Sequence, residues 1–138
     1  MKTGVYFCNC GTNISEKVDS NIVRDSISKT PGQIHFKTID FLCSEEGKEL
    51  LLNDLKENNI DRVVISACSP RDHENTFMHV LSKAGINPYL MQMVNTREQV
   101  AWVTEDKAKA TGKTTRYIIA AIKRVLLHDT LEKKEIDI

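Results

Sequence analysis

The sequence predicts an α/β domain in which a small parallel sheet of about four strands lies between helical layers. Four short apolar segments alternate with amphipathic ones, and residues that favour helix starts follow the apolar segments. Alternation at this spacing implies right-handed crossovers between parallel strands. We therefore expect a Rossmann-like or flavodoxin-like three-layer sandwich that ends in a long C-terminal helix.

Four segments have the composition of β-strands. The clearest is Arg62–Ala67, whose continuous β-branched run suits a strand that is covered on both faces. Alternation of apolar and polar residues predicts a second strand at Gln33–Phe41. The remaining two predicted strands are Gly4–Asn9 and Tyr89–Val94.

Capping residues and apolar stripes predict the helices. Serine and aspartate favour N-caps, proline suits a first helical position, and glycine ends helices. The predicted helices run from Asp19 or Ser20 to about Ser28, from Ser44 to about Asn59, and from Ser69 and Pro70 to Gly85.

The chain beyond Thr96 is also predicted to be helical, first around Val100–Val103 and then strongly from Ala108 to about Leu131. Trp102 is expected in the core or at an interface. The residues predicted to dock the long helix onto the sheet are Tyr117, Ile118, Ala121, Ile122, Val125 and Leu126.

The composition and length of the chain narrow the classes of protein to which it can belong. We expect the 138 residues to form one domain, residues 1–138, and the 19 basic residues balance the 19 acidic ones. A net charge near zero argues against nucleic-acid binding, and no segment approaches the length of a membrane span. The first residues are too short and too polar for a signal peptide. We therefore expect a cytoplasmic protein with neither nucleic-acid nor membrane partners, in which thiols stay reduced.

All four cysteines are predicted at one edge of the sheet. Cys8 and Cys10 close the first predicted strand, Cys43 follows the second, and Cys68 ends the third. Ligands of parallel α/β sheets bind at the carboxyl ends of the strands, so three strands would deliver their thiols to one place. Four converging thiols at that edge are suited to an iron–sulfur cluster.

Other interpretations of the cysteines remain open. Four thiolates also suit a structural zinc ion, although the chain has no Cys-x2-4-Cys pair, and the usual ferredoxin spacing is missing too. Cys8 and Cys10 could form a redox dithiol, and isolated cysteines are often small buried hydrophobes. His73 and Glu74 are candidates for a role beside the site, whereas His35, His79 and His128 are expected on the surface.

Several motifs resemble the amino-terminal domain of the A subunit of heterodisulfide reductase, from about Val5 to Leu131. They are Cys8-Asn9-Cys10-Gly11-Thr12-Asn13, Cys43-Ser44, Ala67-Cys68-Ser69-Pro70-Arg71-Asp72-His73-Glu74-Asn75-Thr76-Phe77, Ala84-Gly85-Ile86-Asn87-Pro88-Tyr89, Asn95-Thr96-Arg97-Glu98-Gln99 and Trp102-Val103.

The resemblance implies an electron-transfer domain that binds one [4Fe-4S] cluster through Cys8, Cys10, Cys43 and Cys68. Members of that family carry flavin and work in electron-bifurcating oxidoreductase complexes. This chain lacks the Gly-x-Gly-x-x-Gly fingerprint of a flavin domain, so FAD is expected only in a partner domain or subunit. The expected partners are that flavin-containing part, ferredoxin and a second copy of the chain. The domain is not expected to be catalytic alone, and the alternative is a zinc- or thiol-stabilised assembly domain without redox activity.

Overall fold

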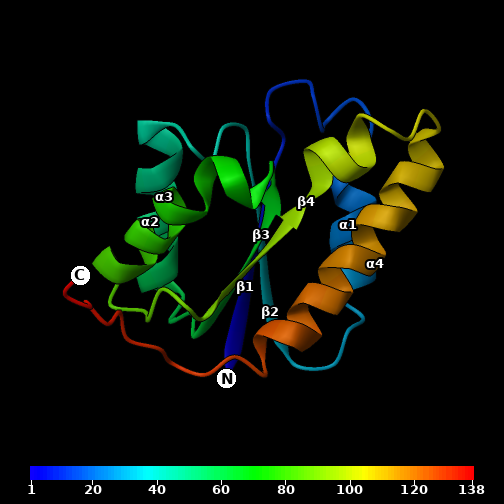
Figure 1. The fold of residues 1–138 in the computed structure, drawn as a ribbon. Helices are drawn as coiled ribbons and strands as arrows, with labels where there is room; N and C mark the ends of the chain where they lie inside the picture. The colour runs from blue at the N-terminus through cyan, green and yellow to red at the C-terminus, as the bar shows by residue number, and fades with distance from the viewer.

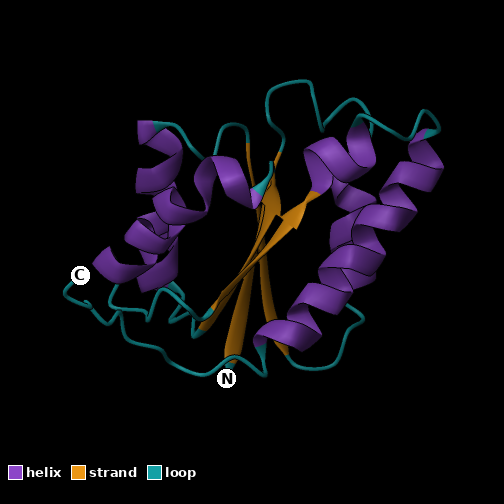
Figure 2. Ribbon diagram, in the orientation of Figure 1, coloured by secondary structure: helices purple, strands orange, loops and turns teal.

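A four-stranded, entirely parallel sheet forms the centre of the molecule (Figures 1 and 2). The computed structural model describes all residues from Met1 to Ile138. The strands lie in the order β2-β1-β3-β4. Their bounds are Lys2–Cys8 for β1, Gln33–Ile39 for β2, Arg62–Ala67 for β3 and Met91–Asn95 for β4. Because the strands are parallel, all four carboxyl ends meet at one edge of the sheet.

Helices cover both faces of this sheet (Figure 1). One face packs against α1 (Ser20–Ile27) and α4 (Lys107–Val125), and the other against α2 (Glu45–Glu57) and α3 (Pro70–Lys83). The π-helical turn η1 (Arg97–Ala101) follows the carboxyl end of β4. Val5 and Phe7 of β1 belong to the core on the α4 face, whereas Tyr6 and Cys8 belong to the core on the α2 face. This alternation in a buried central strand confirms the predicted three-layer α/β fold.

Local capping begins three of the helices where the sequence predicts. The side chain of Asp19 accepts hydrogen bonds from the backbone N–H groups of Asn21 and Ile22. Ser44 accepts from Gly47 N, and Ser69 accepts from Arg71 N. These caps fix the starts of α2 and α3 directly after the segments that carry Cys43 and Cys68, respectively.

The C-terminal helix differs from its prediction at its end and on one side. It ends at Val125, six residues before Leu131, and it is followed by a turn in which His128 Nδ1 lies 2.9 Å from the carbonyl oxygen of Tyr89. Ile118, Ala121, Ile122 and Val125 are buried as predicted, but the side chains of Tyr117 and Leu126 are exposed. Successive helical residues are rotated by about 100°, so a residue next to the apolar stripe falls beside the packed face.

The fourth strand is also shorter than predicted, because Tyr89 and Leu90 precede it and β4 begins at Met91.

No helix combines the length and the apolar character that crossing a bilayer would require.

Candidate functional site

The four cysteines lie at or directly after the carboxyl ends of three adjacent strands. Cys8 is the last residue of β1, and Cys10 follows in the loop. Cys43 lies between β2 and α2, and Cys68 lies between β3 and α3. All four are free thiols. The strand order β2-β1-β3 therefore brings together at one edge residues that are up to 60 positions apart in sequence.

The sulfur of Cys8 is surrounded by backbone polar groups. It accepts the N–H of Cys10 at 3.3 Å and the N–H of Leu42 at 3.4 Å, and it lies 3.7 Å from the carbonyl oxygen of Asp40. Its contacts with Asp40 and Leu42 direct the buried Cys8 toward the loop that carries Cys43. Burial raises the pKa of Cys8, although the two N–H groups act in the opposite direction by stabilising a thiolate.

The backbone turns sharply at Cys10 and Gly11. Cys10 has a φ of 49° and Gly11 a φ of 61°, so two consecutive residues adopt the left-handed conformation. This region is unfavourable for a residue with a Cβ, and such strain is found mainly at functional sites. A Cβ added at Gly11 would also lie 2.9 Å from the ring of Phe41, so a glycine is needed where the two cysteine-bearing loops meet.

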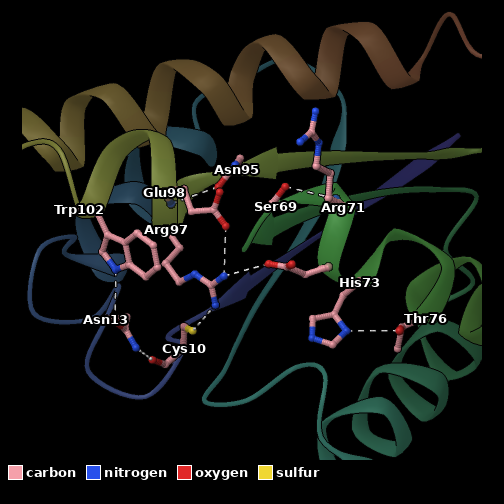
Figure 3. Close-up of polar contacts among 11 residues, drawn as sticks. Cys10, Asn13, Ser69, Arg71, His73, Thr76, Asn95, Arg97, Glu98 and Trp102 are labelled. Atoms are coloured by element: carbon pink, nitrogen blue, oxygen red, sulfur yellow. Dashed lines mark hydrogen bonds and ion pairs between the residues drawn. The ribbon is translucent and has the colours of Figure 1, made fainter.

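Arg97 of η1 connects the end of β4 to this edge (Figure 3). Its Nη1 lies 3.7 Å from the sulfur of Cys10, and its Nη2 forms ion pairs with Asp72 at 2.9 Å and Glu98 at 3.2 Å. Its Nε is buried and has no hydrogen-bond partner. A guanidinium group thus contacts a thiol while one of its donors remains unused.

The indole ring of Trp102 packs against the same guanidinium. The carbon atom at the centre of that group lies 5.0 Å from the ring centroid, and the indole N–H donates to the side-chain oxygen of Asn13 at 3.3 Å. This stack holds Arg97 against Cys10 from the solvent side. Trp102 is itself 58% exposed, so a place in the core is wrong, whereas its expected place at an interface stays a prediction.

Electrostatic coupling extends across all four thiols. Burial raises the pKa of Cys68 to about 11, and the positive charge of Arg97 opposes this increase. Negative charge on Cys43 raises the pKa of both Cys8 and Cys68, and Cys10 acts on Cys8 in the same direction. The amino ends of α2 and α3, which follow Cys43 and Cys68, add favourable positive potential for an anionic group at this edge.

The predicted site residues therefore share one edge, but their role as ligands remains a prediction. No three His, Cys, Asp or Glu side chains lie close enough together to hold one metal ion. His73 lies 3.3 Å from the hydroxyl oxygen of Thr76 within α3. Arg97 was not among the predicted site residues, and its position in the Arg97-Glu98-Gln99 motif was the only signal in the sequence that pointed to it.

Comparison with known proteins identifies relatives of this chain. The A subunit of a heterodisulfide reductase from Methanosarcina acetivorans, described as ferredoxin/F420H2-dependent, is 47% identical over 114 residues, which cover 82% of this chain and 14% of that protein. The iron-sulfur A subunit of a heterodisulfide reductase from Methanopyrus kandleri is 37% identical over 139 residues, which cover 100% of this chain and 21% of that protein. A protein from Archaeoglobus profundus, described as similar to the heterodisulfide reductase A subunit, is 38% identical over 99% of this chain and 20% of that protein.

No protein-family model matches the chain. The chain spans 14–21% of the length of these curated relatives, so the similarity concerns one part of a much longer protein. In the Methanopyrus kandleri and Archaeoglobus profundus relatives that part includes the cysteine edge and nearly the whole fold, because those alignments cover 99–100% of this chain. The chain therefore belongs to the family of heterodisulfide reductase A subunits and corresponds to a domain-sized part of such a protein.

Proposed function

We propose that this chain, residues 1–138, is one electron-transfer domain that binds a [4Fe-4S] cluster through Cys8, Cys10, Cys43 and Cys68. The observation that carries the proposal is that four free thiols follow the carboxyl ends of three adjacent strands along one sheet edge, with Arg97 against the sulfur of Cys10. A bound cluster would supply reversible one-electron exchange.

The donors around the thiols suit a group with net negative charge. Backbone N–H groups of Cys10 and Leu42 point at the Cys8 sulfur, and the guanidinium group of Arg97 has one buried donor without a partner. A four-thiolate cluster is anionic, and hydrogen bonds to its sulfurs influence its potential. The charge and the donors around the thiols therefore support an anionic cofactor here, with Arg97 as the cation that would offset its charge.

The partners follow from the relatives and from the surface beside the cysteines. The names of several relatives contain ferredoxin or iron-sulfur, which supports a role in a heterodisulfide reductase-type complex. We place that complex in the cytoplasm, where thiols stay reduced. Phe41, Trp102 and Val103 are 53%, 58% and 68% exposed in loops near the cysteine edge. We assign this apolar surface to the contact with a flavin-containing domain or subunit, or with ferredoxin.

The test is anaerobic reconstitution of the purified chain with iron and sulfide. The wild type should bind about four iron and four acid-labile sulfide per chain and give an EPR signal after reduction. Cys68→Ser should bind almost none and remain folded by circular dichroism, because the buried sheet does not depend on the metal. Cys10→Ser should retain at most a labile cluster. His73→Ala is the matched control and should bind as much iron as the wild type.

Two results would contradict the proposal. Wild-type iron and sulfide in Cys68→Ser would remove Cys68 from the ligand set. Stoichiometric zinc without sulfide in anaerobically prepared wild type would instead favour an assembly domain stabilised by zinc.

A further inference from the structure

Helix α4 concentrates positive charge on one side of a chain that is neutral overall (Figure 1). The helix contains no aspartate or glutamate, and its basic residues are Lys107, Lys109, Lys113, Arg116, Lys123 and Arg124. None of these six side chains takes part in an ion pair. The two acids directly before the helix are Glu105 and Asp106, and Asp106 serves as its cap by accepting from the backbone N–H of Lys109.

Five of the six basic residues share the face of α4 that points away from the sheet. Buried residues such as Ile118 and Val125 define the face that meets the sheet. At about 100° of rotation per residue, the five fall within roughly a third of a turn on the opposite face. We call them the basic strip: Lys109, Lys113, Arg116, Lys123 and Arg124. All are exposed except Lys113, which is half-buried, and at about 1.5 Å of rise per residue the strip is about 22 Å long.

The stability of the helix does not explain the basic strip. Lys109 and Lys113 are four residues apart, a spacing at which like charges repel each other on a helix. Lys107 and Lys109 lie in the first turn, where the helix dipole disfavours cations, and that turn contains no acidic residue. The strip therefore carries an electrostatic cost in the free chain, and a bound anionic surface would remove that cost.

A hollow of about 300 Å³ lies beside the strip, between α4 and β4. Arg124 belongs to the strip and also lines this hollow, together with Met93, Val94, Tyr117 and Ala120. Tyr117 is exposed instead of packed against the sheet, so its ring is available to a partner. Tyrosine and arginine beside an apolar recess are typical of the residues that dominate binding at protein interfaces.

We propose that the basic strip binds an acidic surface of another protein, one that presents a row of carboxylates with an apolar side chain beside them. The carboxylates would pair with the strip, and the apolar side chain would enter the hollow at Tyr117. This surface contains none of Phe41, Trp102 and Val103, so it is a second interface that is independent of the cysteine edge.

The distribution of charge favours a protein over a nucleic acid as the occupant. A nucleic-acid-binding domain normally has a basic excess, whereas the acids of this chain balance its basic residues. Helix α2, in the opposite layer, carries exposed acids that would repel a long polyanion: Glu45, Glu46, Glu49 and Glu57. A compact acidic protein surface needs to meet only the strip, and its apolar side chains match the hollow.

The experiment titrates the metal-free chain into a fluorescently labelled helical peptide that has a row of glutamates and one leucine beside them. Fluorescence anisotropy should show binding at low salt that weakens as salt is added. Lys109→Glu/Arg116→Glu should raise the dissociation constant by about tenfold or more. Lys56→Glu/Lys83→Glu is the matched control, because it changes the net charge equally at exposed positions of α2 and α3. It should stay within about twofold of the wild type.

Tyr117→Ala tests the hollow separately from the charge. It should weaken binding of the leucine-containing peptide and have little effect on the same peptide with alanine in place of leucine. Circular dichroism checks that each variant is folded.

Four results would overturn the proposal. They are no binding of the peptide at low salt, an equal loss of affinity in the two double variants, an equal effect of Tyr117→Ala on both peptides, and tighter binding of a duplex RNA or of anionic lipid vesicles than of the peptide. Because all samples lack iron, none of these outcomes bears on the cluster proposal.

Discussion

The molecule contains two polar clusters of opposite character, one around Asp54 and one around Arg97. The carboxylate of Asp54 in α2 is 7% exposed and is fully used: Tyr6 Oη, His35 Nε2 and Lys37 Nζ lie 2.7–2.8 Å from its oxygens. His35, predicted as a plain surface residue, is thus part of a structural network.

At Arg97, by contrast, one hydrogen-bond donor has no partner. Its Nε is buried without a partner, and its Nη1 contacts a thiol at 3.7 Å, beyond the length of an ordinary hydrogen bond to oxygen. The Asp54 cluster is complete within this chain and stabilises the joining of β1, β2 and α2. The Arg97 cluster leaves one buried donor without a partner, which distinguishes it from the fully paired Asp54 cluster.

The largest expected effect is on stability at Asp54. Asp54→Asn removes the negative charge that three donors share. The amide that replaces it carries a donor NH2 group, which faces donors that the carboxylate had accepted from. The free energy of unfolding should therefore fall by about 2–4 kcal/mol. Urea denaturation measures this loss. Asp25→Asn, at a carboxylate that is 71% exposed, is the control and should cost less than about 0.5 kcal/mol. A loss below about 1 kcal/mol at Asp54 would show that this network is not structural.

The same carboxylate should give stability a defined pH dependence. Burial alone would raise the pKa of Asp54, but the hydrogen bonds from Lys37 and Tyr6 hold it below its usual range. A depressed folded pKa stabilises the protein above the unfolded value of about 3.9, and this contribution is lost as the pH falls through the folded value. The difference in unfolding free energy between wild type and Asp54→Asn should therefore be constant above about pH 5 and shrink below about pH 4. A difference that stays constant through the acid range would contradict this.

Arg97→Gln should affect the site more than the fold. Its ion-pair partners are partly exposed, so the loss of stability should stay below the loss caused by Asp54→Asn. In reconstituted protein the midpoint potential should become more negative, because the reduced state carries one more negative charge and loses its nearest cation. An EPR-monitored redox titration measures this, with Arg97→Lys as the charge-conserving control. In metal-free protein, Trp102 fluorescence should change as the stack is lost. An unchanged potential would leave Arg97 with a structural role only.

The smallest expected effect is a difference in thiol reactivity in metal-free protein. Exposed Cys43 should react with iodoacetamide first, whereas Cys68 should be slow at about pH 8 because its pKa is about 11. The rate at Cys68 should rise about tenfold per pH unit until the pH approaches that pKa. Mass spectrometry of labelled peptides gives both rates. Equal rates at the two cysteines under these conditions would show that burial does not control the reactivity of the Cys68 thiol.

The sequence alone determined the features that depend on neighbouring residues. Hydrophobic periodicity and capping at Ser44 and Ser69 predicted the strand-helix order, and that order was enough to bring Cys8, Cys43 and Cys68 to one edge. Parallel topology makes this result insensitive to errors at element boundaries, because every strand delivers its carboxyl end to the same side.

Tertiary structure decided the contacts between residues far apart in the chain. Arg97 reaches Cys10 across 87 positions, and Asp54 reaches Tyr6 across 48. These pairings require the strand order β2-β1-β3-β4 and the packing of side chains on each face, neither of which is encoded in a local pattern. The early end of α4 and the exposure of Tyr117 have the same origin. A helix buries only the residues that meet the sheet, and the position of the sheet relative to α4 is set by the whole fold.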